Sequence, residues 1–356
     1  MHSRLRKLLV STLGLATVPA AQSRAQRADS TGTIVGLVVA AEGGVPLGYG
    51  MASIPVRGVE RLANERGEFV FANIAAGTVE LLVRRIGYTP ARITTTVRPG
   101  AVDTVRVTLA RLAVQLTAVH VSANRVCTHP GAPDPTVDPA FAAIFDQLEQ
   151  NADAYRLLAT TYPFTYDIER RSTIRYVGGD EIVQRLDTER LGTGMKWHYK
   201  PGEVVVADAS PVNRQVIFNL PALIHFAEPA FLANHCFYSG GRETIAGSPA
   251  LRVDFLAASR IKTPDVDGSM YIDPVTYQIR RSVLRLTRIP EETPQISSVT
   301  VTTDFRTVVA SISIANVISS THQLFADTTR PVLPFAVYET QRLLRVTFLN
   351  GAPPRP

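Results

Sequence analysis

Long apolar runs are absent from this sequence, which excludes a membrane-spanning helix in the mature chain. The apolar stretch near the N-terminus, Leu8–Ala16, is far shorter than the roughly 20 residues that a helix needs to cross a bilayer. Arg4, Arg6 and Lys7 precede it and small residues follow it, as in a secretory signal peptide. We therefore expect residues 1–25 to be a signal peptide. The mature protein is then periplasmic, associated with the outer membrane, or extracellular.

A strong charge of one sign is also lacking once these 25 residues are set aside. The whole chain has 37 basic and 31 acidic side chains, a formal net charge of +6. Four basic residues and no acidic ones lie in the first 25 positions, so the rest carries 33 basic against 31 acidic groups, a net charge of +2. This balance excludes a general attraction to nucleic acid. Because 45% of residues are hydrophobic and 19% are charged, the chain can bury real cores.

Cysteine is scarce, with Cys127 and Cys236 alone in the sequence. In an oxidising compartment two cysteines most simply form one disulfide. Free thiols are a second arrangement. Zinc bound by both cysteines with His129 and His235 is a third, although adjacent strand residues such as His235 and Cys236 point to opposite faces and do not readily share one ion.

Short β-rich runs separated by turn residues fill residues 30–123. The runs are Thr33–Ala40, Met51–Val56, Glu68–Phe71, Thr78–Arg85, Ile93–Val97 and Thr104–Leu109. Phe69 and Phe71 alternate with Glu68 and Val70, so both rings belong to one face of a strand. Strands of this length and spacing predict a Greek-key β-sandwich.

Several motifs of this first part appear in a fixed order. They are Gly36-x-Val38, Pro46-Leu47, Gly67-Glu68-Phe69-x-Phe71, Asn73-Ile74-x-x-Gly77, Ile86-Gly87-Tyr88 and Val105-x-Val107-x-Leu109. This order resembles the carboxypeptidase regulatory-like family, which also caps many TonB-dependent outer-membrane receptors. Gly48–Met51 and Ala63-Asn64 depart from the family pattern. The resemblance implies an accessory or carbohydrate-binding-like role, for which Tyr49 and Tyr88 are the candidate aromatic residues.

Residues 124–137 are rich in turn formers and predict a linker, which leaves residues 138–356 as a second domain. Asp138 and Pro139 suit the first turn of a helix. The apolar residues between Phe141 and Tyr155 recur at helical spacing. After Pro163 the sequence becomes a succession of longer strands. The expected fold is therefore mainly β overall, with this domain an α+β structure built on a curved antiparallel sheet.

A hairpin pattern within the second domain carries a further resemblance. Its segments are Gly247–Phe255, Asp267–Pro274 and Ile279–Arg281. They resemble the half-barrel of outer-membrane lipoprotein-sorting and lipoprotein-carrier proteins. The resemblance implies a sheet curved around helices with an apolar cavity inside. Trp197 is the candidate to line such a pocket, and a strand with one buried aromatic residue is the alternative.

Catalytic patterns are few. His225-x-x-Glu228 fits the zinc-binding pair of metallocarboxypeptidases, but a third ligand with recognisable context is missing. Asp265-Val266-Asp267-Gly268 resembles the start of a calcium loop without its later carboxylates, and a hairpin turn is the better interpretation. We therefore expect no metal, no cofactor and no enzymatic activity.

The expected function follows from export and two β-rich domains. The leading hypothesis is a non-catalytic envelope protein in which the sandwich is a docking module. The second domain binds an apolar ligand, such as a lipid, or an outer-membrane protein partner. The alternatives are a carbohydrate-binding accessory protein of polysaccharide uptake and, further off, a zinc-dependent hydrolase.

Overall fold

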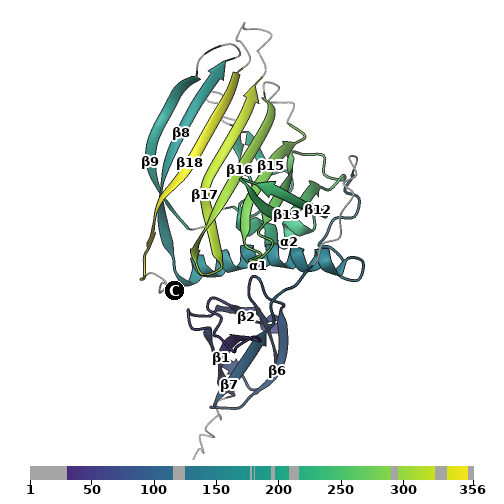
Figure 1. Cartoon of the computed structure of the whole chain (residues 1–356), viewed down its shortest axis with the longest axis vertical. Coiled ribbons are helices and arrows are strands. Elements are labelled where there is room, and N and C mark those ends of the chain that lie inside the picture. Colours follow the sequence, from purple (N-terminus) through teal and green to yellow (C-terminus); the bar gives the residue numbers. More distant parts are fainter. Residues whose placement is uncertain are drawn as a thin grey trace, which may run out of the picture.

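The structure is a computed structural model that describes residues 30–114, 125–176, 179, 181–193, 197–207, 216–289, 296–324 and 335–351. The predicted signal peptide lies outside these residues. A small β-sandwich and a tall curved sheet lie on opposite sides of one long helix (Figure 1). The chain is thus mainly β, as predicted. Among the described residues no helix is long and apolar enough to span a membrane.

The first part is a sandwich of two small sheets. One has the strand order β4-β1-β7 and the other β3-β2-β5-β6; β1 and β7 run parallel, and the other neighbouring strands run antiparallel. The strands are β1 (Thr31–Ala40), β2 (Met51–Ile54), β3 (Val59–Leu62), β4 (Glu68–Ala75), β5 (Gly77–Arg84), β6 (Ala91–Val97) and β7 (Val102–Leu109), with a 3-10 turn η1 (Pro55–Arg57). Phe69 and Phe71 share the buried face, as their alternation predicts. Gly36 lies directly beneath the Phe69 ring, where a side chain would overlap it.

The second part begins with helix α1 (Pro139–Thr161). The Asp138 carboxylate accepts a hydrogen bond from the Phe141 N–H at 2.9 Å and caps the helix as predicted. One antiparallel sheet follows, in the order β12-β13-β14-β15-β16-β17-β18-β8-β9. Its strands are β8 (Phe164–Tyr176), β9 (Glu181–Gly192), β12 (His235–Ile245), β13 (Ser248–Ala257), β14 (Asp265–Ile272), β15 (Ile279–Thr287), β16 (Ile296–Val309), β17 (Ile312–Leu324) and β18 (Phe335–Phe348).

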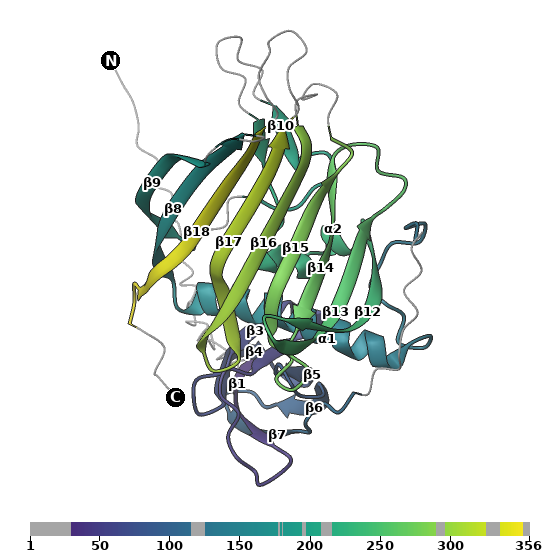
Figure 2. The same cartoon turned by 45° about the horizontal axis from the view of Figure 1, so that its top comes forward.

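The sheet curves so that one face encloses the space above α1 (Figure 2). The segment between β9 and β12 lies inside the curve and contains the hairpin β10 (Val205–Ala207) and β11 (Val216–Phe218), the 3-10 helix η2 (Leu223–Ala227) and the short helix α2 (Pro229–Leu232). Apolar side chains of α1, of η2 and α2, and of the inner face form one buried cluster. The hydrophobic face of α1 is turned toward this cluster, and residues at every second position of the strands contribute side chains to it.

The predicted linker covers one edge of this sheet. Cys127 and Cys236 form a disulfide with a Cα–Cα distance of 5.4 Å, which confirms the predicted pairing. The Gly131 N–H donates to the His235 carbonyl at 2.9 Å, and the Ser259 N–H donates to the Cys127 carbonyl at 2.8 Å. The segment therefore pairs with β12, whose backbone groups would otherwise form an open edge.

The sandwich is packed against α1. The Gln147 side chain, fully buried, accepts the Gly87 N–H at 2.6 Å. On the same helix Asn151 donates to the Tyr277 carbonyl and accepts the Ile279 N–H, each at 2.9 Å. Because these two amides join both β structures to α1 by buried hydrogen bonds, the helix holds the two parts in a fixed arrangement.

Candidate functional site

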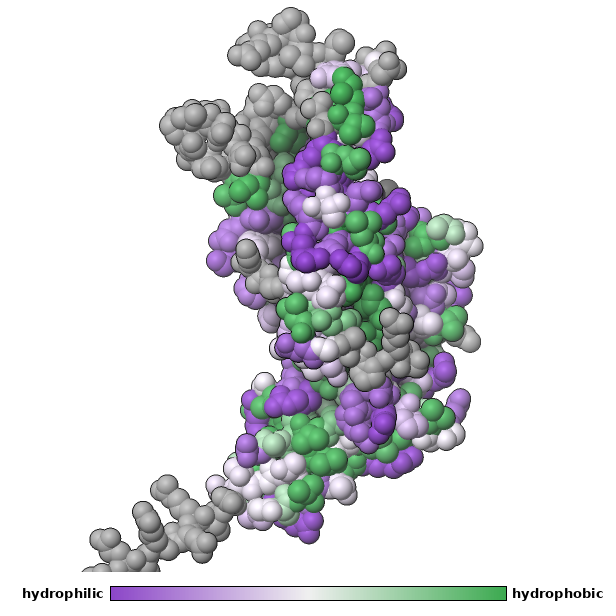
Figure 3. Space-filling model, turned by 90° about the vertical axis from the view of Figure 1, so that its left-hand side faces the viewer, coloured by the Kyte–Doolittle hydropathy of each residue, from purple (hydrophilic) through white to green (hydrophobic). Residues whose placement is uncertain are grey.

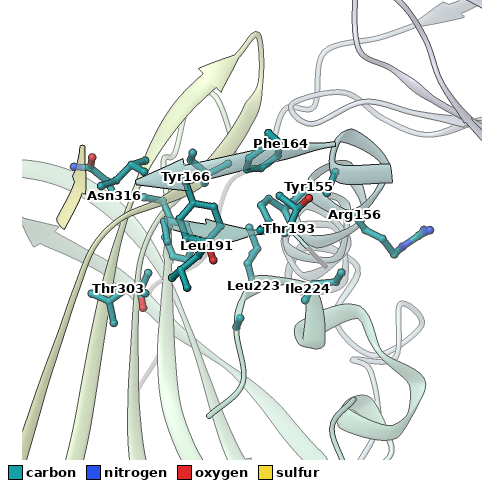
Figure 4. A pocket seen from close by; sticks show the side chains of 18 of the residues that line it. Tyr155, Arg156, Phe164, Tyr166, Leu191, Thr193, Leu223, Ile224, Thr303 and Asn316 are labelled. Carbon is teal, nitrogen blue, oxygen red and sulfur yellow. The ribbon is translucent and has the colours of Figure 1, made fainter. Parts of the chain in front are cut away.

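A cavity of about 830 Å³ lies between the inner face of the curved sheet, the C-terminal half of α1 and η2. Figure 4 shows side chains from α1, β8, β9, η2, β16 and β17 around it. Most of the lining is apolar; the main contributors are Ala159, Phe164, Tyr166, Ile168, Leu191, Leu223, Ile224, Phe305, Ile314, Ile318 and Leu343. A volume of this size is in the range of binding sites for small apolar molecules, roughly 300–1,000 Å³.

The strand register explains why the sheet side of the cavity is apolar. Ile168 of β8 lies opposite Leu343 of β18, and Tyr166 lies opposite Leu191 of β9. Directly opposed residues share a face of the sheet. Their outward neighbours are polar; Asp167, for example, forms ion pairs with Arg190 and Arg345. The alternation therefore places apolar groups inside and charges outside.

The helix side contributes neutral groups. Tyr155 lines the cavity, and burial raises the pKa of its hydroxyl to about 12. Burial also raises the pKa of Tyr166 on the facing strand. Both phenols therefore remain neutral at physiological pH. The Arg156 side chain extends away from the other labelled residues in Figure 4, and its guanidinium bonds Glu60 of the sandwich at 2.6 Å.

The third wall, η2, is held in place by the residues that suggested a zinc site. The His225 ring accepts the Ala222 N–H at Nδ1 (2.8 Å), and its Nε2 lies 3.1 Å from the Trp197 carbonyl. The Glu228 carboxylate accepts the Tyr199 N–H at 2.9 Å. These contacts anchor η2 to the segment before it. Among the described residues no group of three or more His, Cys, Asp or Glu side chains is arranged to hold a metal ion.

Tyr199 continues this anchoring to the sheet. Its hydroxyl donates to the Asp265 carboxylate at 2.6 Å, where the sequence suggested a hairpin turn or an incomplete calcium loop. Asp265 instead lies within β14, and both side chains are buried. A chain of hydrogen bonds therefore runs from η2 through Glu228 and Tyr199 to β14, and fixes the wall of the cavity relative to the sheet.

Comparison with known proteins assigns this chain to no family and finds only distant structural similarity. No protein-family model matches the chain, and no curated protein matches it. Among solved structures, a putative outer membrane lipoprotein-sorting protein domain from Vibrio parahaemolyticus superposes with a TM-score of 0.30 and 9% identity, over 59% of this chain and 92% of that one. A DUF1329 family protein from Desulfovibrio piger superposes with a TM-score of 0.31 and 9% identity, over 59% of this chain and 93% of that one. A LolA superfamily protein from Nitrosomonas europaea superposes with a TM-score of 0.29 and 10% identity, over 58% of this chain and 94% of that one.

The aromatic residues proposed from the sequence lie elsewhere. Tyr49 and Tyr88 are 2% and 7% exposed, and the guanidinium groups of Arg85 and Arg111 lie near the Tyr88 ring, so neither ring is open for stacking on a sugar. Tyr49 packs in the cluster shared with α1, which the strand pattern of the sandwich alone does not reveal. Trp197 lies outside any strand and packs against His225, one layer behind the cavity wall. The expected glycan platform is therefore not formed by these tyrosines.

Sequence reasoning missed the residues that β16, β17 and β18 contribute to the cavity wall. A signal was present, because Val299, Val301 and Thr303 occupy every second position of one strand, and the last of them lines the cavity. Alternation alone does not tell which of the two sets points inward, since a shift of one residue exchanges the faces. Pairing with neighbouring strands decides this.

The side of α1 nearest the sandwich carries an unusual group of acids. Glu149 lies among Asp146, Asp153 and Arg84, and burial, followed by the charge of Asp146, raises the pKa of Glu149 to about 7. The folded protein therefore retains a proton on Glu149 that the unfolded chain releases above about pH 4.5. As a result, the free energy of unfolding falls as pH rises from about 4.5 to 7.

We expect Glu149→Gln to remove this pH dependence. The variant should match the wild type near pH 4 and exceed its free energy of unfolding by about 1–3 kcal/mol at pH 8, because a buried carboxylate no longer has to ionise. Denaturant unfolding measured at several pH values tests this. Glu42→Gln, at an exposed turn, is the matched control and should leave the curve unchanged. If the free energy of unfolding varied with pH in the same way in Glu149→Gln and the wild type, Glu149 would not be the source of this pH dependence.

Proposed function

We propose that this protein is a non-catalytic envelope protein that binds the acyl chain of a lipid or lipoprotein in the cavity between α1 and the curved sheet. The cavity is the observation that carries the proposal. It is large, mostly apolar, and its tyrosines are neutral. Burial of an acyl chain there gains roughly 0.8 kcal/mol for each methylene group removed from water.

Two further features support a place outside the cytoplasm. The disulfide between Cys127 and Cys236 persists in an oxidising compartment. The first 25 residues have the composition of a signal peptide. We propose that export carries the mature chain to the periplasm or to the surface of the outer membrane.

The sandwich, residues 30–123 in the proposed division of the chain, serves in this proposal as a rigid docking module. Its support is the hydrogen-bonded contact with α1 and the ion pair between Arg84 and Asp153 at 2.8 Å. The same helix lines the cavity, so whatever binds the sandwich is held at a fixed position relative to the ligand. The resemblance to carboxypeptidase regulatory-like domains remains a prediction.

Native mass spectrometry of the mature protein purified from its own envelope, followed by organic extraction, tests the proposal. We expect a co-purifying lipid in the wild type. Thr303→Trp places a large ring on the inner face and should reduce the lipid-bound fraction severalfold. Thr302→Trp, the neighbouring residue on the outer face, is the matched control and should retain lipid.

Chain length provides a second measure in the same experiment. In reconstitution with acyl chains, removal of four carbons should weaken binding by up to about 3 kcal/mol, because each buried methylene contributes about 0.8 kcal/mol. A protein that carries no lipid from the envelope and binds no acyl chain of any length would overturn the proposed function.

A further inference from the structure

The inner face of the curved sheet changes character beyond the cavity. Along β8, the inward residues Tyr166 and Ile168 line the cavity, and the next inward residue is Arg170. Along β18, Leu343 and Gln341 line the cavity and Glu339 follows. Each step of two residues advances about 7 Å along a strand. A group of charged side chains therefore begins at the next inward-facing residue of each strand, just past the apolar wall of the cavity.

This group, here called the polar cluster, comprises Arg170, Arg185, Asp187, Glu189 and Glu339. The Arg170 guanidinium lies 3.0 Å from Glu189 and 3.5 Å from Glu339. Arg185 donates to Asp187 at 2.6 Å and lies 3.1 Å from Glu189. Asp187 and Arg170 are directly opposed across β9 and β8, so they share the inner face.

The polar cluster lies on β8, β9 and β18, at the end of the sheet that β9 forms. Figure 3 shows the molecule from this side, where hydrophilic and hydrophobic side chains are interspersed. Its side chains are only half-buried; Arg170 is 24% and Asp187 35% exposed, so solvent and solutes reach them. Charges at this position would not help a carrier to bind a pure hydrocarbon. The attraction between paired charges is largely offset by the cost of removing them from water, so the pairs add little stability either.

The charges of the polar cluster are not balanced. Two arginines face three carboxylates, which leaves one net negative charge. Two of its atoms, Arg170 Nε and Asp187 Oδ1, are themselves buried and have no hydrogen-bond partner among the described residues. The ion pairs of the network therefore leave one buried donor and one buried acceptor unpaired, and a ligand would reach the same side chains through their exposed atoms.

We infer that the polar cluster binds the head group of the ligand, and that this head group is zwitterionic, of the phosphoethanolamine class. This inference rests on the proposed function, since the acyl chain occupies the cavity. With the chain against Ile168, Leu191 and Leu343, the glycerol end lies at Gln341. The phosphate then meets the Arg170 guanidinium, and the ammonium meets Asp187 and Glu339, whose surplus charge favours a cation and disfavours an anionic head group.

The test is competition for the full mature protein between an apolar dye without a head group, 1-N-phenylnaphthylamine, and lysophospholipids with one acyl chain in common. We expect lysophosphatidylethanolamine to displace the dye at about tenfold lower concentration than lysophosphatidylglycerol, the gain of a charge-assisted contact. Asp187→Asn and Glu339→Gln should abolish this preference while dye binding stays unchanged, which shows that the variants are folded.

Glu169→Gln is the matched control, because Glu169 lies next to Arg170 on the outer face of β8 and undergoes the same change of charge. It should retain the preference. Equal displacement by both lysophospholipids, or a preference for the anionic one, would overturn the inference and leave the acyl-chain function in place. A protein that binds neither the dye nor either lysophospholipid would refute the function itself, and the head-group site with it.

Discussion

Replacement of Asp265 with alanine is expected to lower the free energy of unfolding by about 3–5 kcal/mol, because it leaves two buried polar groups without a partner, at about 1–3 kcal/mol each. Asp265, His235 and Tyr199 are buried together, with at most 1% of each residue exposed. The Asp265 carboxylate accepts the Tyr199 hydroxyl at 2.6 Å and lies 3.4 Å from His235 Nε2. Alanine leaves both groups without this partner in a dry interior.

The surroundings of His235 make the carboxylate especially important. The two ring nitrogens lie 2.9 Å and 3.1 Å from the carbonyl oxygens of Phe231 and Val266. The Asp265 carboxylate is a further polar neighbour of this ring, and all three of these contacts are buried. The loss of the carboxylate therefore also removes a polar contact of a buried imidazole.

Chemical denaturation of Asp265→Ala and of Asp304→Asn measures the effect. Asp304 forms an ion pair with Arg281 on the outer face and is 39% exposed, so its replacement should cost less than about 1 kcal/mol. Tyr199→Phe removes one hydrogen bond and should cost about 1–2 kcal/mol. A loss of less than 1 kcal/mol in Asp265→Ala would contradict the structural role of these buried hydrogen bonds.

The variant should also weaken ligand binding beyond its effect on folding. Asp265 holds Tyr199, and Tyr199 holds Glu228 at the end of η2, whose residues Leu223 and Ile224 line the cavity. Movement of η2 changes the shape of that wall. Dye affinity at a temperature where the variant is folded separates this effect from stability.

Removal of the disulfide is the second large effect, with an expected loss of about 4 kcal/mol. The bond joins residues 109 apart in sequence, and a cross-link over a loop of this length restricts the unfolded chain strongly. We expect the paired replacement Cys127→Ser with Cys236→Ser to unfold at a correspondingly lower denaturant concentration than the wild type.

Reductant provides the control for this prediction, since it should destabilise the wild type and leave the paired serine variant unchanged. Hydrogen exchange adds a local measure, because the Ser259 N–H bonds the Cys127 carbonyl. Its protection should fall in the variant as the segment leaves the β12 edge. Equal stability of the oxidised and reduced wild type would contradict the prediction.

Several elements of the fold follow from local sequence. The cap at Asp138 and the apolar spacing from Phe141 onward specify α1, because capping and helical periodicity act within a few residues. Alternation specifies the strands of the sandwich and of the large sheet. With two cysteines in the sequence, one disulfide was the simplest pairing, and the structure contains it.

Local sequence did not predict the roles of individual aromatic and titratable residues. Tyr49 was a candidate glycan-binding residue, and it is buried because α1, about 100 positions later, packs over it. His225 and Glu228 read locally as a metal-binding pair, and they instead bond backbone groups of residues 197–199 and 222. Contacts between segments distant in sequence decide both cases.

Local patterns and simple counts predict a mainly β protein with one long amphipathic helix, and they make a cross-link the simplest arrangement of its two cysteines, because these properties depend on residues near one another or on composition. Packing between distant segments sets which face of each strand points inward, and so where the cavity and the polar cluster lie. The side-chain period of a strand is two, and its absolute phase is set by pairing with neighbours and by what packs against the sheet. Arg170 and Ile168 have the same parity on one strand, yet the one contacts carboxylates and the other lines the cavity.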